Sequence, residues 1–332
     1  MTVESLLRSL GDEIEDAEEE SFLLFSQPIP SQNLGFVDSS ATSIDLTIAG
    51  RDLTIHQSPT ILSSTRGGGT TGAVLWKITP LIAAWLASPS NPFTTHSIFT
   101  PSSTLLELGS GISGLIALAL SPSIGSYTLT DQSYVLKLLR QNITSNLPST
   151  RTSKSTTTNN SSGKSKSKSK FKRGATQAAA ATEGGDGGEG EGDSNIQLRT
   201  LDWETDEVAG LLPGGGSFDA VIACDCIYND ALIDPLVQAC ADACRLRERA
   251  KQSNSSNGDD TANSAEGAAG GIGNVEGKTV CIIAQQQRSD EVFEAWLTAF
   301  KEPFRVWRVP DELAGEGLKG GEGFMVHVGV LK

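Results

Sequence analysis

The sequence predicts an α/β fold in which a mostly parallel, Rossmann-like sheet is covered by helices on both faces. Short apolar runs alternate with helical segments from about residue 103 onward, which is typical of a parallel sheet. The run 218–224 is apolar throughout, as expected for a strand buried on both faces. The runs 304–309 and 324–331 are joined without a helix, so we expect them to pair antiparallel at the C-terminus.

The pattern predicts seven strands in this sheet, five crossing helices and one separate hairpin. The strands are expected at 103–108, 126–130, 196–201, 218–224, 279–284, 304–309 and 324–331. The helices are expected at 74–86, 113–120, 133–143 and 231–249, and after an N-cap at Ser289. Pro80 must lie in the first turn of its helix or kink it. Polar and apolar residues alternate over 43–48 and 53–56 around a turn at 49–51, which predicts a β-hairpin.

The 332 residues divide into an N-terminal extension, 1–65, and a main domain, 66–332. Two low-complexity segments interrupt the main domain, at about 148–194 and 252–277. Both contain almost no large apolar side chains, so they cannot bury enough surface to offset the loss of chain entropy. We interpret them as disordered insertions in surface loops.

The composition excludes several classes of protein. A net charge of -14 argues against general nucleic-acid binding and favours basic partners, although the basic run Lys164–Arg173 remains a candidate RNA contact or nuclear signal. Apolar runs of about 18 residues, as a membrane helix requires, are absent. The N-terminus lacks a basic start and an apolar middle, so we expect an intracellular, cytoplasmic protein, with the nucleus as a second compartment.

The five cysteines are expected to be reduced and structural. An odd number of cysteines in an intracellular chain argues against a disulfide framework. No second pair of ligands stands at a spacing that suits zinc, so no metal site is predicted.

A glycine-rich turn at 107–114 carries the first functional signal. It reads Glu-Leu-Gly-Ser-Gly-Ile-Ser-Gly and lies between a predicted strand and a predicted helix, where a doubly wound fold binds its ligand. Asp131 follows at the end of the next strand, and an acidic side chain there can accept hydrogen bonds from ribose hydroxyls. This pattern predicts a nucleoside cofactor but does not distinguish NAD from S-adenosylmethionine.

Three features favour S-adenosylmethionine and a class I methyltransferase sheet. Glu107 precedes the turn where dinucleotide-binding folds usually carry an apolar residue. The expected C-terminal antiparallel pair differs from the parallel end of a dinucleotide-binding sheet. Finally, the sequence contains no Tyr-x-x-x-Lys pair or His/Asp set suited to hydride transfer.

Several motifs together resemble the family 16 methyltransferases, which include the methyltransferase-like 21 protein-lysine methyltransferases and fungal enzymes that act on ribosomal lysines. In chain order they are Gly72-Ala73-Val74-Leu75-Trp76, the turn at 107–114, Asp131, Leu201-Asp202-Trp203 and Cys224-Asp225-Cys226-Ile227-Tyr228. The resemblance spans 66–147, 196–249 and 278–332. The glycine turn is common to the whole class, whereas the two tryptophans and the Asp-x-x-Tyr motif are more specific.

The resemblance implies a set of site residues. Cofactor contacts are implied for Trp76, Gly109, Ser110, Gly111, Asp131, Trp203 and Cys224. Trp203 could stack on adenine, and Trp76 could offer a cation–π contact to the sulfonium. Asp225 and Tyr228 are implied at the catalytic end, where Asp225 would orient the incoming ammonium and Tyr228 would border its channel. Two alternatives stay open: Asp225 could cap the following turn, and Tyr228 and the tryptophans could be core residues.

The function expected on these grounds is S-adenosylmethionine-dependent methylation of a protein lysine. The resemblance implies a monomer acting on a basic ribosomal protein, of the large-subunit L1 type, or on another translation-related protein. A small-molecule N-methyltransferase, a non-catalytic cofactor-binding scaffold and an NAD oxidoreductase remain as alternatives.

Overall fold

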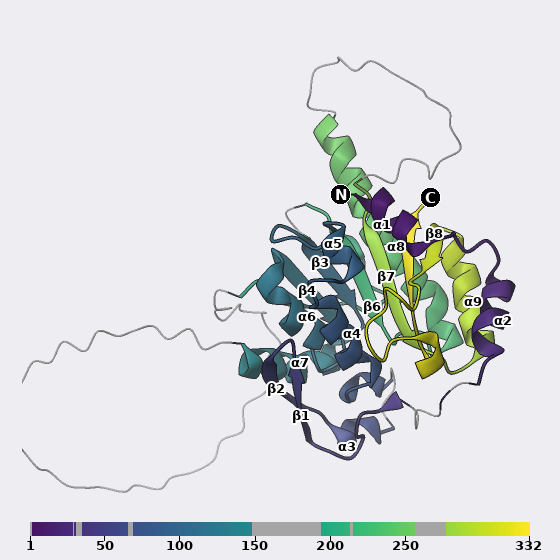
Figure 1. Cartoon of the computed structure of the whole chain (residues 1–332). Helices are drawn as coiled ribbons and strands as arrows, with labels where there is room; N and C mark the ends of the chain where they lie inside the picture. The colour runs from purple at the N-terminus through teal and green to yellow at the C-terminus, as the bar shows by residue number, and fades with distance from the viewer. Residues whose placement is uncertain are drawn as a thin grey trace, which may run out of the picture. The chain divides into compact units, whose positions relative to one another are not determined.

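A computed structural model gives the arrangement of most of the chain (Figure 1). The described residues are 2–28, 30, 35–65, 69–147, 194–212, 215–255 and 277–332. The expected insertions at 148–194 and 252–277 lie almost entirely outside the described residues, as does the basic run 164–173. One compact unit consists of Met1–Leu147 and Asn195–Lys332. The division at residue 65 therefore stays a sequence-based prediction.

Within the described residues, seven strands form one mixed sheet in the order β5-β4-β3-β6-β7-β9-β8. The strands are β3 (Thr104–Leu108), β4 (Ser126–Asp131), β5 (Ile196–Thr200), β6 (Ala220–Cys224), β7 (Val280–Gln286), β8 (Phe304–Arg308) and β9 (Phe324–Leu331). The first five lie parallel, and β9 pairs antiparallel with both β7 and β8. The predicted fold class and its C-terminal antiparallel pair are confirmed.

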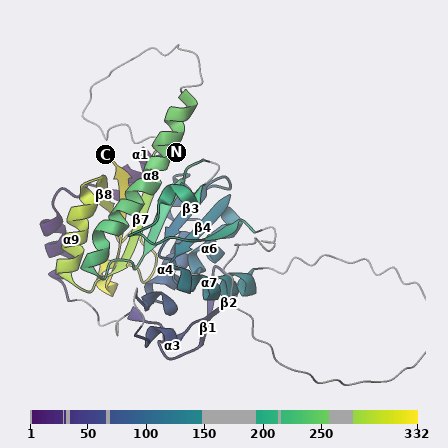
Figure 2. The same ribbon diagram turned by 180° about the vertical axis from the view of Figure 1, so that it is seen from behind.

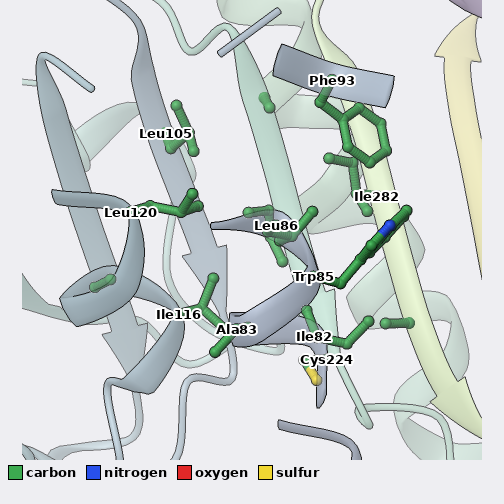
Figure 3. Packing of buried hydrophobic residues seen from close by; sticks show 14 of the residues in the cluster. Ile82, Ala83, Trp85, Leu86, Phe93, Leu105, Ile116, Leu120, Cys224 and Ile282 are labelled. Atoms are coloured by element: carbon green, nitrogen blue, oxygen red, sulfur yellow. The ribbon is translucent and has the colours of Figure 1, made fainter. Parts of the chain in front are cut away.

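Helices cover both faces of this sheet (Figure 1, and from behind in Figure 2). One face carries α4 (Ile78–Leu86), α6 (Leu115–Leu120) and α7 (Ser133–Asn146), and the other carries α8 (Ile233–Ser255) and α9 (Asp290–Lys301). Successive residues of β7 alternate between the two cores, with Ile282 on the first face and Ile283 on the second. Figure 3 shows the first core, where Leu86, Ile116 and Leu120 pack over Leu105 and Ile282.

The shorter elements connect or flank these layers. They are α3 (Pro59–Leu62), α5 (Pro92–Thr95) and the 3₁₀ turns Thr71–Ala73, Ser121–Ser123, Val208–Leu211, Asp230–Leu232 and Gly320–Glu322. None of the described helices is long and apolar enough to span a membrane.

The order of the strands places a ligand site beside β3. The chain runs from β3 outward to β4 and β5, then crosses to β6 on the other side of β3. The strand order therefore reverses between β3 and β6, and ligands of open α/β sheets bind at the carboxyl ends of strands at such a switch point.

The predicted hairpin forms a separate antiparallel sheet of β1 (Ser43–Ile48) and β2 (Arg51–His56). Its turn is shorter than expected, because Arg51 pairs with Ile48 as part of β2. Asn142 on α7 accepts a hydrogen bond from the His56 N–H and donates one to the His56 carbonyl. The hairpin is thus tied to the helical layer of the main sheet.

Two N-terminal helices, α1 (Val3–Leu10) and α2 (Ala17–Phe25), were not predicted from the sequence. Thr2 and Asp16 supply their N-caps. The buried residues of α1 recur with helical spacing, at Val3, Leu6, Leu7 and Leu10. Glu20 on α2 lies 3.0 Å from Arg308 of β8 and 3.4 Å from His327 of β9, which anchors α2 to the antiparallel end of the sheet.

The expected helix at 74–86 begins four residues late, at Ile78. The preceding residues are extended, because Trp76 forms a bridge with Phe36 and the Leu75 carbonyl accepts a hydrogen bond from Val37. These residues are apolar because they are buried in an extended segment. Hydrophobic periodicity alone cannot distinguish such a segment from a buried helix. Pro80 lies in the first turn of α4, which is one of the two arrangements expected from the sequence; the other was a kink in the helix.

Candidate active site

All nine residues singled out from the sequence line one cavity of about 410 Å³. The cavity lies where β3, β4 and β6 end, at the predicted switch point. Its volume is in the usual range for small-molecule and cofactor sites. The residues are Trp76, Gly109, Ser110, Gly111, Asp131, Trp203, Cys224, Asp225 and Tyr228.

The glycine turn has the tight geometry that its sequence predicts. Gly109 has φ +66°, and a Cβ there would lie 2.7 Å from the Cys226 Sγ and 2.9 Å from the Trp203 Cζ2. Any larger residue would therefore push Trp203 away from the turn. Gly111 also has positive φ, +60°, and leaves its backbone open to the cavity wall.

Asp131 supports this turn with its carboxylate. Its Oδ2 accepts a hydrogen bond from the Gly111 N–H at 2.8 Å, and its Oδ1 accepts one from the Gln132 N–H at 2.7 Å. Each carboxylate oxygen keeps a further lone pair for a ligand hydroxyl. Burial raises the pKa of Asp131 to about 6, despite these two hydrogen bonds.

Glu107 lies deeper in the same cavity and accepts a hydrogen bond from the Tyr127 hydroxyl at 2.6 Å. Its pKa is raised to about 8: burial is the largest cause, the Tyr127 hydrogen bond acts in the opposite direction, and the nearby Asp131 adds to the rise. Glu107 is therefore mostly protonated at neutral pH. The sequence placed this acid beside the turn but gave no sign of its partner Tyr127, which lies on the neighbouring strand β4.

The two tryptophans occupy different parts of the wall. Trp203 packs its ring edge over Gly109. Trp76 packs against Phe36 in a tilted arrangement, with ring centroids 4.6 Å apart, and donates its indole N–H to the Thr71 carbonyl. A guanidinium already lies over the Trp76 ring, because the Arg288 Cζ is 5.1 Å from its centroid. The cation–π partner observed for Trp76 is thus a side chain of the protein.

Asp225 is held by an ion pair that the sequence did not reveal. Its Oδ1 and Oδ2 accept hydrogen bonds at 2.6 Å from the two terminal nitrogens of Arg288. The Asp225 side chain is only 2% exposed, so its carboxylate is shielded from water, while the Arg288 side chain is 24% exposed. The backbone at Asp225 is left-handed, with φ +60°, and its N–H donates to the Ala284 carbonyl. The Asp225 Oδ1 also accepts a hydrogen bond from the Gln286 N–H at 3.3 Å, which links Asp225 to β7.

Tyr228 is not a core residue. Its side chain is 41% exposed, and its hydroxyl lies 3.0 Å from the Thr71 hydroxyl. Burial of the hydroxyl end raises the pKa of Tyr228 above its ordinary value. The phenol is therefore neutral at physiological pH, and it bridges the loop before α4 to the loop after β6.

Arg288 is the functional candidate that sequence reasoning missed. It joins Asp225 and Trp76 and also donates to the Gln286 side-chain oxygen at 3.1 Å. A signal was available, because Arg288 lies two residues after the end of β7 and the carboxyl ends of parallel strands meet at one edge of the sheet. A lone arginine in a loop is too common, however, to be selected without the register of β6 and β7.

The cysteines in the site are buried thiols. Cys224 and Cys226 line the cavity, and burial raises the pKa of both well above the ordinary value. Cys224 lies 3.9 Å from the Thr79 hydroxyl. All five cysteines are free and buried. In the part of the chain that the structure describes, no group of three His, Cys, Asp or Glu side chains is placed to hold a metal ion.

Comparison with known proteins identifies one family. A family profile described as lysine methyltransferase matches residues 55–161 and 188–250, about half of the chain. The ribosomal lysine N-methyltransferase 5 of Eremothecium gossypii is 29% identical over 247 residues, covering 63% of this chain and 70% of that protein. Its counterpart from Vanderwaltozyma polyspora is 33% identical over 147 residues, covering 35% and 45%.

A third relative carries a different name. The diaminohydroxyphosphoribosylamino-pyrimidine deaminase of Schizosaccharomyces pombe is 38% identical over 134 residues, or 40% of this chain and 32% of that protein. In this relative and three of the ribosomal lysine methyltransferases, the aligned part is 32% to 45% of the relative's length. The family is therefore established, whereas whole-protein activities do not carry over from these names.

The Asp225–Arg288 pair makes a testable contribution to stability. Replacing Arg288 with Gln leaves a buried carboxylate without its charged partner, and we expect the free energy of unfolding to fall by about 3 kcal/mol in urea titrations. Adding Asp225→Asn to this variant should recover part of the loss. Arg247→Gln is the control, because Arg247 pairs with Asp219, whose carboxylate is more exposed than that of Asp225. Losing this pair should cost about 1 kcal/mol. A loss for Arg288→Gln no larger than the control's would contradict this role.

Glu107 should make stability depend on pH. The folded chain holds the Glu107 proton up to about pH 8, whereas an ordinary carboxyl releases it near 4.5. Its contribution is therefore fully present below the unfolded pKa and is lost as pH rises through the folded one. Relative to Glu107→Gln, the wild-type free energy of unfolding should fall by about 4 kcal/mol between pH 5 and pH 8. Chemical denaturation across this range measures the difference, and a constant difference would refute the raised pKa.

Proposed function

The chain belongs to the lysine methyltransferase family, and from this premise we propose that it transfers a methyl group from S-adenosylmethionine to a lysine side chain of a protein. The observation that carries the proposal is the meeting of the glycine turn, Asp131 and the Asp225-x-x-Tyr228 motif around one cavity. These features come from three separate stretches of sequence. Their convergence at the switch point of the sheet is what a cofactor-dependent transfer requires.

The residues present fit S-adenosylmethionine. The absence of a Cβ at Gly109 lets Trp203 pack directly against the turn, and Asp131 keeps acceptor capacity for ribose hydroxyls. Trp203, packed over Gly109, offers an aromatic surface for adenine. When bound, the cofactor supplies a methyl group activated by a positively charged sulfur. We assign Gly109, Ser110, Gly111, Asp131, Trp203 and the backbone of Cys224 to holding it.

Tyr228 and Asp225 shape the acceptor side. In the transfer, the lysine nitrogen forms a bond to the methyl carbon, the carbon–sulfur bond breaks, and the lysine gives up a proton to solvent. A free lysine has a pKa of about 10.4, so the site must favour its neutral form. Tyr228 is neutral and half exposed, so it can line the entry without charging it.

Asp225 contributes by position in this proposal. Its negative charge is compensated by Arg288 at 2.6 Å, so it does not hold an incoming lysine as a tightly bound ammonium. Arg288 fixes the Asp225 corner and also lies over Trp76. Most of the rate enhancement then comes from orienting the amine in line with the methyl group. This replaces the direct contact between Asp225 and the ammonium that we expected from sequence.

The proposed substrate is a basic ribosomal protein. Two observations support it: several relatives are named ribosomal lysine N-methyltransferase 5, and this chain carries a net charge of -14. An acidic enzyme approaches a basic partner faster through long-range attraction. The exposed Tyr228 favours a protruding side chain of a macromolecule over an enclosed small molecule.

Methyl transfer can be tested directly. Wild-type chain incubated with methyl-labelled S-adenosylmethionine and ribosomes from a strain lacking the gene should label one or more ribosomal proteins on lysine. Tyr228→Ala should lower kcat about tenfold, because it disturbs only positioning, and should leave the affinity for S-adenosylhomocysteine nearly unchanged. Asp234→Ala, at an acid expected only to begin a helix, is the control and should keep full activity. Absence of label, or label on arginine or histidine, would contradict the proposal.

A further inference from the structure

A groove lies between α2 and the segment 309–322, apart from the cofactor cavity. We call it the α2 groove; its volume is about 380 Å³. Its floor is apolar and buried, with Leu24, Leu318, Phe324 and Met325 each no more than 8% exposed. Leu23 lines one wall and is 49% exposed. The groove thus has buried apolar side chains beneath it and the water-facing Leu23 at its edge, while most of its exposed lining is polar.

One wall of the α2 groove is acidic. On the α2 side the groove is lined by Leu23, Leu24 and Gln27, and the helix has no basic residue. The opposite wall, 309–322, has four acidic residues and one lysine, and Asp311 and Glu312 line the groove itself. Arg308 lies among them but is paired with Glu20 at 3.0 Å. These charges repel nucleic acid and a second copy of this acidic chain, and they attract a basic polypeptide.

A small hollow of about 50 Å³, which we call the side hollow, shares lining residues with both the α2 groove and the cofactor cavity. Met325 lines both the α2 groove and the side hollow, and Tyr228 lines both the side hollow and the cofactor cavity. Each hollow thus adjoins the next through one common side chain, in the order cofactor cavity, side hollow and α2 groove. Of the four large apolar side chains more exposed than a third among the described residues, Tyr228 and Leu23 mark the two ends of this path.

The side hollow contains an independent sign of a ligand. Gln285 lines it and is only 2% exposed, yet its Nε2 makes no hydrogen bond with the described residues. A buried amide nitrogen without an acceptor is costly and uncommon. The carbonyl oxygen of a bound polypeptide would supply the missing acceptor.

We propose that the α2 groove and the side hollow bind the basic, partly apolar segment that flanks the target lysine of the protein substrate. In this arrangement Asp311 and Glu312 contact lysine or arginine side chains, and an apolar side chain packs on Leu23 and the groove floor. Gln285 donates to a backbone carbonyl next to the target residue. That the occupant is the substrate rests on the proposed methyltransferase function, whereas its chemistry follows from the groove alone.

The test measures peptide binding without methyl transfer. A fluorescein-labelled peptide of alternating lysine and leucine is titrated with the full chain, and fluorescence anisotropy gives its Kd. Exchanging Asp311 and Glu312 together for Lys should raise this Kd about tenfold, and Gln285→Leu should raise it about fivefold. The matched control exchanges Asp45 and Asp52, exposed acids of the β1–β2 hairpin, for Lys. It changes the net charge equally and should leave the Kd within about twofold.

The outcomes are distinguishable. An equal loss in the control variant, or an unchanged Kd in the Asp311 and Glu312 variant, would overturn the groove assignment whether or not the chain methylates lysine. S-adenosylhomocysteine affinity, measured in each variant, should stay at the wild-type value and shows that the fold is intact. If the peptide results hold and ribosomal proteins remain unlabelled, the groove assignment stands and the proposed function fails.

Discussion

The buried ion pair between Asp225 and Arg288 is the contact on which the rest of the site depends. It joins the residue after β6 to the loop after β7, with Asp225 in a left-handed conformation that the pair and the Ala284 hydrogen bond hold in place. Arg288 then lies over Trp76, whose extended segment pairs with Phe36. The Arg288 guanidinium thus links three segments around one cavity. They are the segment at Phe36, the loop before α4 and the Asp225-x-x-Tyr228 motif.

The buried acids of the cavity and the exposed acids of the surface differ in protonation. Inside, Glu107 and Asp131 have raised pKa values because they are buried, so the cavity carries less negative charge at neutral pH than its sequence implies. Outside, carboxylates remain exposed on α2 and on the segment 309–322. Such an arrangement lets the cavity accept a nucleoside cofactor while the surface attracts a basic protein.

The sequence predicted the sheet well because its signals are local. Continuous apolar runs gave the strands, and the helix-free connection between β8 and β9 gave the antiparallel end. The nine residues predicted for the site come from short motifs, most of them at strand ends, and they line one cavity. What was missed depends on contacts distant in sequence: Arg288 has meaning only beside Asp225, and Trp76 is extended because Phe36 pairs with it. The apolar residues of α1 recur with helical spacing, but the helix was overlooked because an acidic run follows it directly.

The central claim is that this cavity binds an S-adenosyl cofactor on Asp131 and the glycine turn. Calorimetric titration of the wild-type chain with S-adenosylhomocysteine tests it most directly. The account predicts one saturable site, weakened about tenfold or more in Asp131→Asn because two partly buried backbone N–H groups lose a charged acceptor, and no heat with NAD. Binding of NAD in place of S-adenosylhomocysteine, or equal affinity in wild type and Asp131→Asn, would contradict the account.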